Sequence, residues 1–241
     1  MEAVLNGQRE DGFLPHMITP YTSSAITQPP LLAWGIWNLY TLTKDKTMLE
    51  KTYDKLKKYI EWDEKNRDRN RNSLPEWFIE GNVNCRSGES GMDNSPRFDH
   101  AKDMDAVDFS TFLANDMDCL RKMASELGNI QEAKAWEIKY NKIKENLNQL
   151  LWDKEDEIYY DRDMEGNFNK VKAVSCFIPM FAGLSEPWQA AKLAKHLQDP
   201  NEFRTPFPLP SVARNESTHS TDMWRGSVWI NYNYMIIHGL Y

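Results

Sequence analysis

PLLAWGIWNLYTLTKDKTMLEKTYDKLKKYIEWDEK, residues 30–65, contains two helical patterns of different kinds, one directly after the other. Residues 30–43 are apolar on nearly every face, which is typical of a helix buried on most sides. After a short turn at Lys44, residues 45–65 carry apolar side chains only at helical spacing, so this helix has one solvated face. The apolar stripe of the second helix consists of Leu49, Tyr53, Leu56 and Ile60. We therefore predict a unit in which a buried helix is followed by an amphipathic one.

The same unit recurs along the rest of the chain. Further segments that are apolar on nearly all sides cover residues 105–127, 172–184 and 223–240. Amphipathic segments follow the first two of these, at residues 129–151 and 187–198, and one more begins the chain at residues 1–9. The alternation predicts an all-α fold with an inner ring of buried helices wrapped by an outer ring. An irregular helical bundle is the alternative.

The connections between these helices differ in length in a regular way. Turns from a buried helix to the next amphipathic helix are short, whereas connections back to a buried helix have about 20 to 40 residues. In an antiparallel up-and-down array all the long connections lie at one end, and long loops in compact domains are usually functional. We therefore expect any site at this end. In the third long loop, residues 158–161 and 167–170 are expected to form a small hairpin about Gly166.

Composition narrows the class of protein. The chain has 241 residues, 41% of them hydrophobic, and a formal net charge of −7. These values exclude a collagen or a disordered tail, and an acidic chain is a poor binder of nucleic acid or anionic membranes. No apolar run approaches the roughly 20 residues needed to span a bilayer. The polar start MEAVLNGQRED is unlike a signal peptide, so we expect a cytoplasmic protein without nucleic-acid or membrane partners.

Cysteine and histidine spacing predicts no metal site and no cofactor. Cys85, Cys119 and Cys176 are far apart and form neither a CxxC pair nor a zinc pattern with the five histidines, so we predict reduced thiols. The sequence contains no P-loop, GxGxxG or HExxH motif. It also has no clear DxDD or DDxxD run, which weakens the case for a terpene-cyclase-like toroid.

The segment ESGMDNSPRFD, residues 89–99, is the strongest candidate for catalysis. Glu89 and Asp93 are four residues apart in a stretch that glycines and Pro96 constrain to a loop. Two carboxylates beside Arg86 and Arg97 suit general acid–base work, because a carboxyl screened from water can donate a proton near neutral pH. The alternative is a surface turn with ordinary ion pairs.

The segment MWRGSVWINYNYMIIHGL, residues 223–240, is the second candidate. Trp224, Arg225 and Trp229 stand at the start of a buried helix, where it opens onto the loop-rich end. Tryptophan faces stack on sugar rings, while arginine and amide groups bind hydroxyls. The alternative is that both tryptophans fill the core. Among the nine tryptophans of the chain we expect Trp77 to be a further sugar-binding candidate, and Trp136 and Trp188 to serve packing.

Three motifs together resemble glycoside hydrolase family 63 and, more distantly, the trehalases. They are QPPLLAW (28–34), ESGMDNSPRFD (89–99) and WRGSVWINYNYMIIHGL (224–240). The likeness runs from about Gln8 to Tyr241 and is strongest to bacterial mannosylglycerate and glucosylglycerate hydrolases. It implies an (α/α)6 toroid of the glycosidase type. Because about eight of twelve helices are present, we expect residues 1–241 to form a partial catalytic domain.

The resemblance also implies roles for individual residues. Asp93 matches the general acid of an inverting reaction, which uses a second carboxylate as base, and family members carry that base as a Glu beyond the WRG helix. Glu216 precedes the motif, so no base is assigned in this chain. Arg86-Ser87-Gly88 replaces the aromatic that many relatives carry before ESG, which alters one pocket wall. The implied substrate-binding residues are Gln28, Glu89, Trp224, Arg225, Gly226 and Trp229.

The predicted function is thus hydrolysis of an α-glucoside or α-mannoside, with a carbohydrate as the only expected partner. The 241-residue chain alone is expected to be inactive or nearly so. The rival prediction is a catalytically silent, sugar-binding helical toroid. The sequence does not choose between glucose and mannose, and it indicates no oligomeric state.

Overall fold

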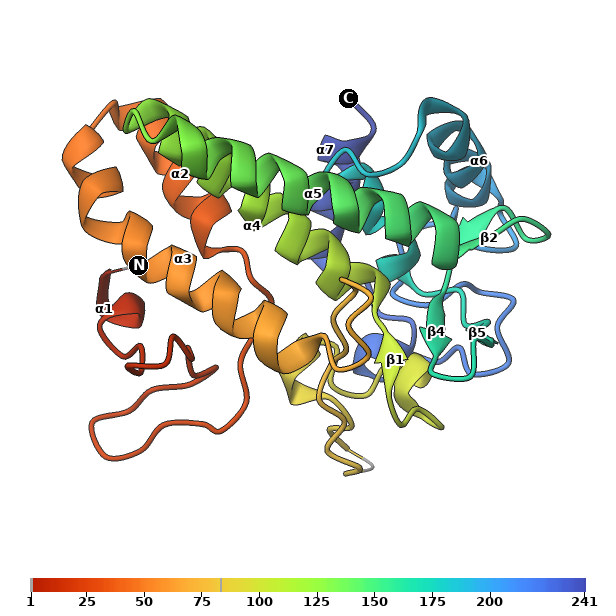
Figure 1. Cartoon of the computed structure of the whole chain (residues 1–241). Helices are drawn as coiled ribbons and strands as arrows, with labels where there is room; N and C mark the ends of the chain where they lie inside the picture. Colours follow the sequence, from red (N-terminus) through yellow and green to blue (C-terminus); the bar gives the residue numbers. More distant parts are fainter. Residues whose placement is uncertain (1, 83) are drawn as a thin grey trace.

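The structure is a computed structural model that describes residues 2–82 and 84–241 (Figure 1). The α-helices are α1 (Glu2–Leu5), α2 (Leu32–Thr43), α3 (Lys46–Arg67), α4 (Val107–Glu126), α5 (Ile130–Leu150), α6 (Pro187–Gln198) and α7 (Ile230–Gly239). The 3-10 helices are η1 (Gly88–Ser90), η2 (Pro96–Phe98), η3 (Val174–Met180) and η4 (Met223–Arg225). The strands are β1 (Met104–Asp105), β2 (Trp152–Asp153), β3 (Ile158–Tyr159), β4 (Asp161–Asp163) and β5 (Phe168–Asn169).

Two layers of helices are present, as the alternating pattern predicts. Helix α4 is buried on nearly all sides and packs against α2, α3 and α5. Helices α3, α5 and α6 bury one face each and form the outer layer. On α5 the indole N–H of Trp136 is buried and donates to the Tyr53 hydroxyl of α3 at 2.9 Å, so the packing role expected for Trp136 is confirmed. The helix-rich fold is an incomplete α/α toroid.

Helices α2 and α7 depart from the prediction of burial on most sides. Only Ala33, Ile36 and Tyr40 are buried on α2, and the apolar Leu42 is 83% exposed. On α7, Ile230 is 81% exposed although Ile236 is fully buried. The apolar patterns of both helices are real, but within the described chain only one face of each finds a packing partner.

The third buried segment is a 3-10 helix where an α-helix was predicted. All residues of η3 are buried, as the apolar pattern requires. Pro179 lies within it, and a proline lacks the amide hydrogen and clashes with the carbonyl four residues earlier, so an α-helix cannot continue there. The prediction was right about burial and wrong about the type of helix.

The hairpin about Gly166 is confirmed, with strands shifted from the expected ones. Strand β4 pairs antiparallel with β5, and β1 adds to β4 as a third strand. Gly166 lies at the turn with φ +90°, a conformation that favours glycine. Ile158–Tyr159 does not join this hairpin, because it pairs with Trp152–Asp153 in a separate two-stranded sheet.

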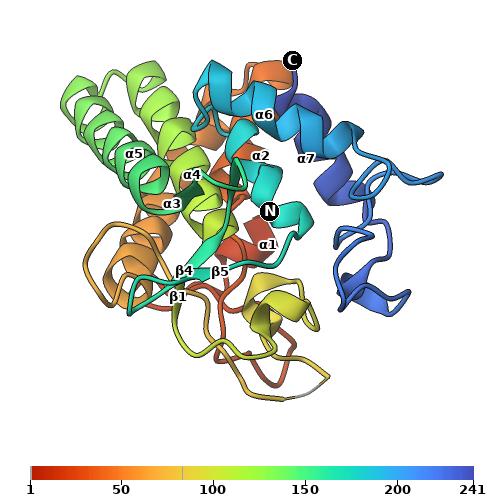
Figure 2. The same cartoon turned by 90° about the vertical axis from the view of Figure 1, so that its right-hand side faces the viewer.

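The long connections gather on one side of the molecule. In Figure 1 the α2–α3 and α4–α5 turns lie together at the upper left, while the loops run along the lower edge and the right. Figure 2 shows the yellow segment around residues 88–99 and the blue loop with η4 on the same lower side. Hydrogen bonds between loops, described below, agree with this arrangement. In the described part of the chain, none of the helices is long and apolar enough to cross a membrane.

Candidate active site

The loop that carries Asp93 is rigid. Helix η1 ends at Gly91, whose φ of +71° suits glycine, and the Ser90 hydroxyl donates to the carbonyl of Ser87 at 2.7 Å and accepts from the Met92 amide at 3.0 Å. The backbone carbonyl of Asp93 accepts a hydrogen bond from the Arg86 amide at 2.8 Å. Asp93 is partly exposed although its neighbours on both sides are buried. The backbone of the predicted acid, Asp93, is therefore held by hydrogen bonds, while its side chain is partly accessible to solvent.

Glu89 anchors this loop through hydrogen bonds to other segments. Both of its carboxylate oxygens accept hydrogen bonds from Arg67, at 2.7 Å each, and the side chain is fully buried. The amides of Thr27 and Phe78 donate to the same carboxylate at 3.0 and 3.2 Å. Glu89 thus joins the end of α3 to two loops. In this conformation the side chain offers no open surface to a sugar.

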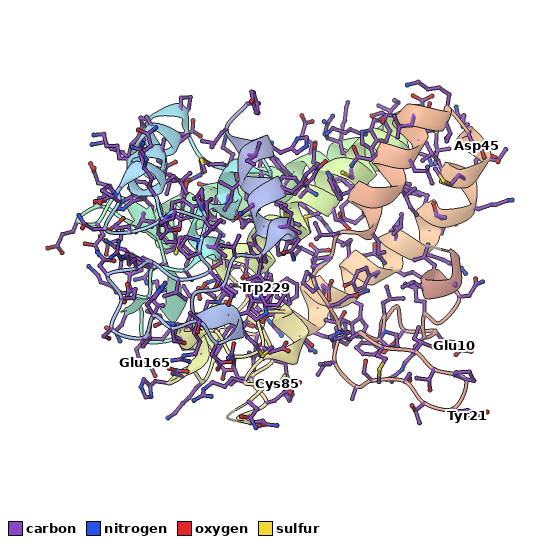
Figure 3. All side chains as sticks on the ribbon, turned by 180° about the vertical axis from the view of Figure 1, so that it is seen from behind. Glu10, Tyr21, Asp45, Cys85, Glu165 and Trp229 are labelled. Carbon is purple, nitrogen blue, oxygen red and sulfur yellow. The ribbon has the colours of Figure 1, made fainter. Side chains whose placement is uncertain are left out.

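Trp224 and Trp229 form a stacked pair. Their ring centroids are 4.0 Å apart and the rings are within 5° of parallel, with Tyr232 packed edge-on against Trp224 at 5.4 Å. Trp224 is buried and Trp229 is partly exposed. Figure 3, which views the molecule from behind, shows Trp229 near the middle, above Cys85 on the lower side. The pair is a broad aromatic surface with one side open.

Gly226 lies where a side chain would not fit. A Cβ atom added there would come within 2.1 Å of the Ser220 carbonyl oxygen and 2.8 Å of the His219 ring. Any other residue would push the backbone of residues 220 and 226 apart. Gly226 therefore allows the tight approach that places Trp224 and Arg225.

Arg225 binds Asp99, an acidic residue of the acid loop (residues 89–99, which include Asp93). Its guanidinium donates to both carboxylate oxygens of Asp99, at 2.9 and 2.7 Å, and Arg86 lies 3.2 Å from the same carboxylate. Burial is the largest single influence and acts to raise the pKa of Asp99, but the hydrogen bonds from Arg225 together with the charges of Arg225 and Arg86 hold that pKa below its ordinary value. The charged form of Asp99 thus ties the WRG segment to the acid loop.

All three motifs line one cavity. It has a volume of about 80 Å³, and its walls come from the first motif, the acid loop and the start of α7. The lining residues are Pro29, Leu31, Ser90, Gly91, Phe112, Trp224, Asn231, Tyr232 and Met235. Segments almost 200 residues apart in the sequence are thus brought together at the loop-rich end, with Trp224 as the aromatic wall.

Gln28 lies beside this cavity and borders another. Its neighbour Pro29 lines the cavity of the three motifs, whereas Gln28 lines a larger depression of about 480 Å³ formed mainly by residues of the first long loop. The backbone carbonyl of Gln28 accepts a hydrogen bond from the Tyr59 hydroxyl at 2.7 Å. Gln28 is partly exposed, so its amide remains a candidate for binding.

The structure corrects the prediction for Trp77. This residue is only 2% exposed and stacks on Phe109 with ring centroids 3.9 Å apart, so it is a core residue and not a sugar contact. Its indole N–H donates to the buried Asp108 at 2.8 Å, which also accepts from Arg97 at 2.6 Å. Asp108 lies in the first turn of α4, and a buried carboxylate needs donors, but nothing in the local sequence says that Trp77 is one of them.

Sequence reasoning also missed Asn94. It follows Asp93 directly, is nearly buried, and makes hydrogen bonds to the segment around Trp224. The only sequence signal was its position within the specific motif ESGMDNSP.

The described residues contain no group of three or more His, Cys, Asp or Glu side chains arranged to hold a metal ion. Cys85, Cys119 and Cys176 are free cysteines, the last two of them buried.

Comparison with known proteins gives a family for the whole chain. Residues 1–241 match the family described as the mannosylglycerate hydrolase MGH1-like glycoside hydrolase domain. An uncharacterized protein of Borreliella burgdorferi is 28% identical over 88% of this chain, and a probable mannosyl-oligosaccharide glucosidase of Schizosaccharomyces pombe is 29% identical over 63%. This chain spans only 42% and 20% of the length of these two relatives.

A solved structure shares the fold closely. The glycoside hydrolase family 63 mannosylglycerate hydrolase of Thermus thermophilus, crystallised with glucose, superimposes with a TM-score of 0.85 at 25% identity. The superposition covers 99% of this chain and 73% of that one. By sequence motifs, by fold and by the match along its whole length, the chain belongs to the MGH1-like glycoside hydrolase family.

Proposed function

We propose that this chain carries the acid and the sugar-binding wall of an inverting glycosidase that cleaves α-glucosides or α-mannosides. The observation that supports this most strongly is the cavity that the three motifs share, with Trp224 as its wall and the acid loop as its rim. The T. thermophilus relative crystallised with glucose is named a mannosylglycerate hydrolase, which favours a small glycoside as substrate. Residues 1–241 would then form part of one catalytic domain.

In this proposal Asp93 is the general acid. Its protonated carboxyl donates a proton to the glycosidic oxygen as the bond to the anomeric carbon breaks. The bonds that hold the backbone of its loop limit where the carboxyl can lie, so less ordering is left for the transition state. Arg225, held by Asp99, and the stacked indoles of Trp224 and Trp229 bind the sugar. Glu89 and Gly226 hold the backbone of these two segments, and Gln28 borders the neighbouring depression, from which its amide would bind the substrate.

The water that replaces the leaving group must be activated by a second carboxylate on the opposite face of the sugar. In inverting glycosidases the two carboxyl groups are roughly 6.5–9.5 Å apart. We propose that this base lies in the part of the longer relatives that the present chain does not span.

Replacement of the acid tests the proposal. We expect Asp93→Asn in the whole protein to lower turnover of mannosylglycerate and glucosylglycerate at least ~100-fold, because the amide has no proton to donate. The melting temperature should stay nearly the same, since Asp93 is partly exposed and its loop is held by backbone bonds and by bonds of the neighbouring residues. Asp54→Asn, at an exposed position on α3, is the control. Near-normal turnover by Asp93→Asn would remove Asp93 from this role.

The 241-residue chain itself gives a second test. We expect it to bind sugar, as measured by tryptophan fluorescence, and to hydrolyse none, because the proposed base is missing. A catalytically silent sugar-binding protein predicts the same result for this chain, so the whole protein must be assayed beside it. Turnover by the whole protein with an inverted product, followed by NMR, supports the enzyme. Sugar binding without turnover by the whole protein supports the silent alternative.

A further inference from the structure

Asn94 uses three groups to bind a segment about 130 residues away in the sequence. Its side-chain oxygen accepts a hydrogen bond from the Trp224 amide at 2.9 Å, and its side-chain nitrogen donates to the Asp222 carboxylate at 2.9 Å. Its backbone carbonyl accepts from the Arg225 guanidinium at 3.1 Å. Asn94 is only 6% exposed, and its bond to the Trp224 amide is buried, whereas its bonds to Arg225 and to the exposed Asp222 are partly buried.

These bonds connect the acid loop, which carries Asp93, to the segment that carries Trp224. The backbone carbonyl of Asp93 accepts a hydrogen bond from the amide of Arg86. Asn94 follows Asp93 directly in the chain. The amide that Asn94 holds belongs to Trp224, whose ring stacks on Trp229. Asn94 thus links the residue next to Asp93 directly to the backbone of Trp224, beside the ion pair between Asp99 and Arg225.

The chemistry of this position fits asparagine and few other residues. One short side chain must accept a hydrogen bond from a backbone N–H and donate one to a carboxylate at the same time. The carboxamide of asparagine has a separate acceptor and donor for these two bonds, whereas a carboxylate has no donor and a hydroxyl has only one oxygen for both. An aspartate here would lose the donor and face the negative charge of Asp222. A buried donor or acceptor left without its partner costs free energy, so the pair is strongly specified.

We propose that Asn94 and Asp222 form a clamp that sets the spacing between Asp93 and the Trp224–Trp229 pair, which makes Asn94 a positioning residue for the sugar site. The clamp acts through the backbone of its neighbours and touches no substrate itself. This inference rests on the function proposed above, because only a site that holds a sugar between an acid and an aromatic wall needs the spacing to be fixed.

Exchange of the two side chains tests the clamp. In the whole protein, Asn94→Asp is expected to lower kcat/KM on mannosylglycerate or glucosylglycerate about tenfold or more, because the donor is lost and two carboxylates face each other. Asp222→Asn keeps a donor and an acceptor in place and is expected to cause a smaller loss. The double variant Asn94→Asp/Asp222→Asn returns one donor and one acceptor to the pair, so it should recover to within about threefold of the wild type.

Two further measurements separate positioning from simple stability. The melting temperature of each variant is recorded, and the sugar affinity of the same proteins is measured by tryptophan fluorescence. Asn201→Asp, at an exposed position away from the site, is the matched control and should change nothing. The clamp predicts that kcat/KM and affinity recover together in the double variant, while a purely structural role would restore only the melting temperature.

The outcomes are distinct for the clamp and for the function. If the wild type turns over the sugar and Asn94→Asp does so equally well, the clamp is wrong and the proposed function stands. The clamp is also overturned if the double variant regains its melting temperature without its activity. If the wild-type whole protein neither binds nor hydrolyses either glycoside, the proposed function fails, and the clamp fails with it.

Discussion

Trp77 and Trp224 are both buried tryptophans in long loops, yet they have different surroundings. Trp77 donates its indole N–H to Asp108 and stacks on Phe109, deep in the core. Trp224 lines the shared cavity and stacks on a partly exposed partner. From the sequence both were candidates for sugar binding, because residue type and loop position are the same. What separates them is the partner of the indole group, which only the three-dimensional fold supplies.

This difference leads to a prediction for Trp77. We expect Trp77→Phe to lower the free energy of unfolding by about 2 kcal/mol, because the buried Asp108 loses one donor and the core loses volume. The affinity for sugar should not change. Urea denaturation and tryptophan fluorescence titration measure the two quantities, and Trp188→Phe, at a residue that is 56% exposed, is the control. A large loss of sugar affinity in Trp77→Phe would show that Trp77 contributes to sugar binding after all.

Glu89 carries a second prediction. We expect Glu89→Gln to destabilise the protein by about 3–5 kcal/mol, because the substitution leaves Arg67 without its charged partner in a mostly buried place. The exposed Glu61→Gln on the same helix as Arg67 is the control, with an expected change within about 0.5 kcal/mol. Denaturant titration checks both values. Equal stability of the two variants would show that the Arg67 pair contributes little.

Helix α2 begins with a carboxylate that another helix supplies. Asp116 on α4 is fully buried and accepts hydrogen bonds from the amides of Ala33 and Trp34, both at 2.9 Å. These amides are among those that a helix start leaves without internal partners. Burial raises the pKa of Asp116 to about 8, although the two amides act in the opposite direction. A residue of one inner helix thus caps the next.

The cap gives stability a dependence on pH. In the unfolded chain Asp116 has an ordinary pKa of about 3.9, whereas in the folded protein it is about 8. Because the folded pKa is the higher one, the stabilisation is complete below pH about 4 and is lost as the pH rises through about 8. We expect Asp116→Asn to flatten this part of the stability curve. Thermal unfolding from pH 5 to 9 measures it, and an unchanged slope would contradict the assignment.

At the scale of elements, sequence patterns predicted more than they missed. Burial followed directly from periodicity, as α4 and α5 show, because an apolar face has to be covered whatever covers it. The type of helix in η3 could have been foreseen from Pro179, whereas the strand partners of Ile158–Tyr159 could not. Strands of two residues depend on contacts between segments, which local sequence does not specify.

At the scale of the molecule, loop lengths predicted the end at which the three motifs meet. They did not reveal how the motifs are joined. The bond between Asn94 and Trp224 links residues 130 positions apart, and no spacing rule within either motif points to it. Motifs could therefore be located from the sequence, but the contacts that hold them together required the fold.

The solvent-exposed faces of α2 and α7 carry a set of large apolar side chains. We expect the double substitution Ile230→Gln/Ile237→Gln to reduce binding of an apolar dye, because these side chains are 81% and 54% exposed. The stability of the fold should change by no more than about 0.5 kcal/mol for each substitution. Ile236→Gln, at a fully buried neighbour, is the contrasting variant and should cost about 2 kcal/mol or more. Undiminished dye binding by the double variant would place the apolar surface elsewhere.

The ion pair between Asp99 and Arg225 has a consequence for synthesis of the protein. The two residues are 126 positions apart, so at about 5–20 residues per second Asp99 is made about 6–25 s before its partner exists. During that time the acid loop has its own turns and the bonds of Glu89 to Arg67, but not its bonds to the segment around Trp224. Asp93 and Trp224 are therefore made at well separated times, and a chain interrupted between them would contain the proposed acid without the proposed sugar-binding wall.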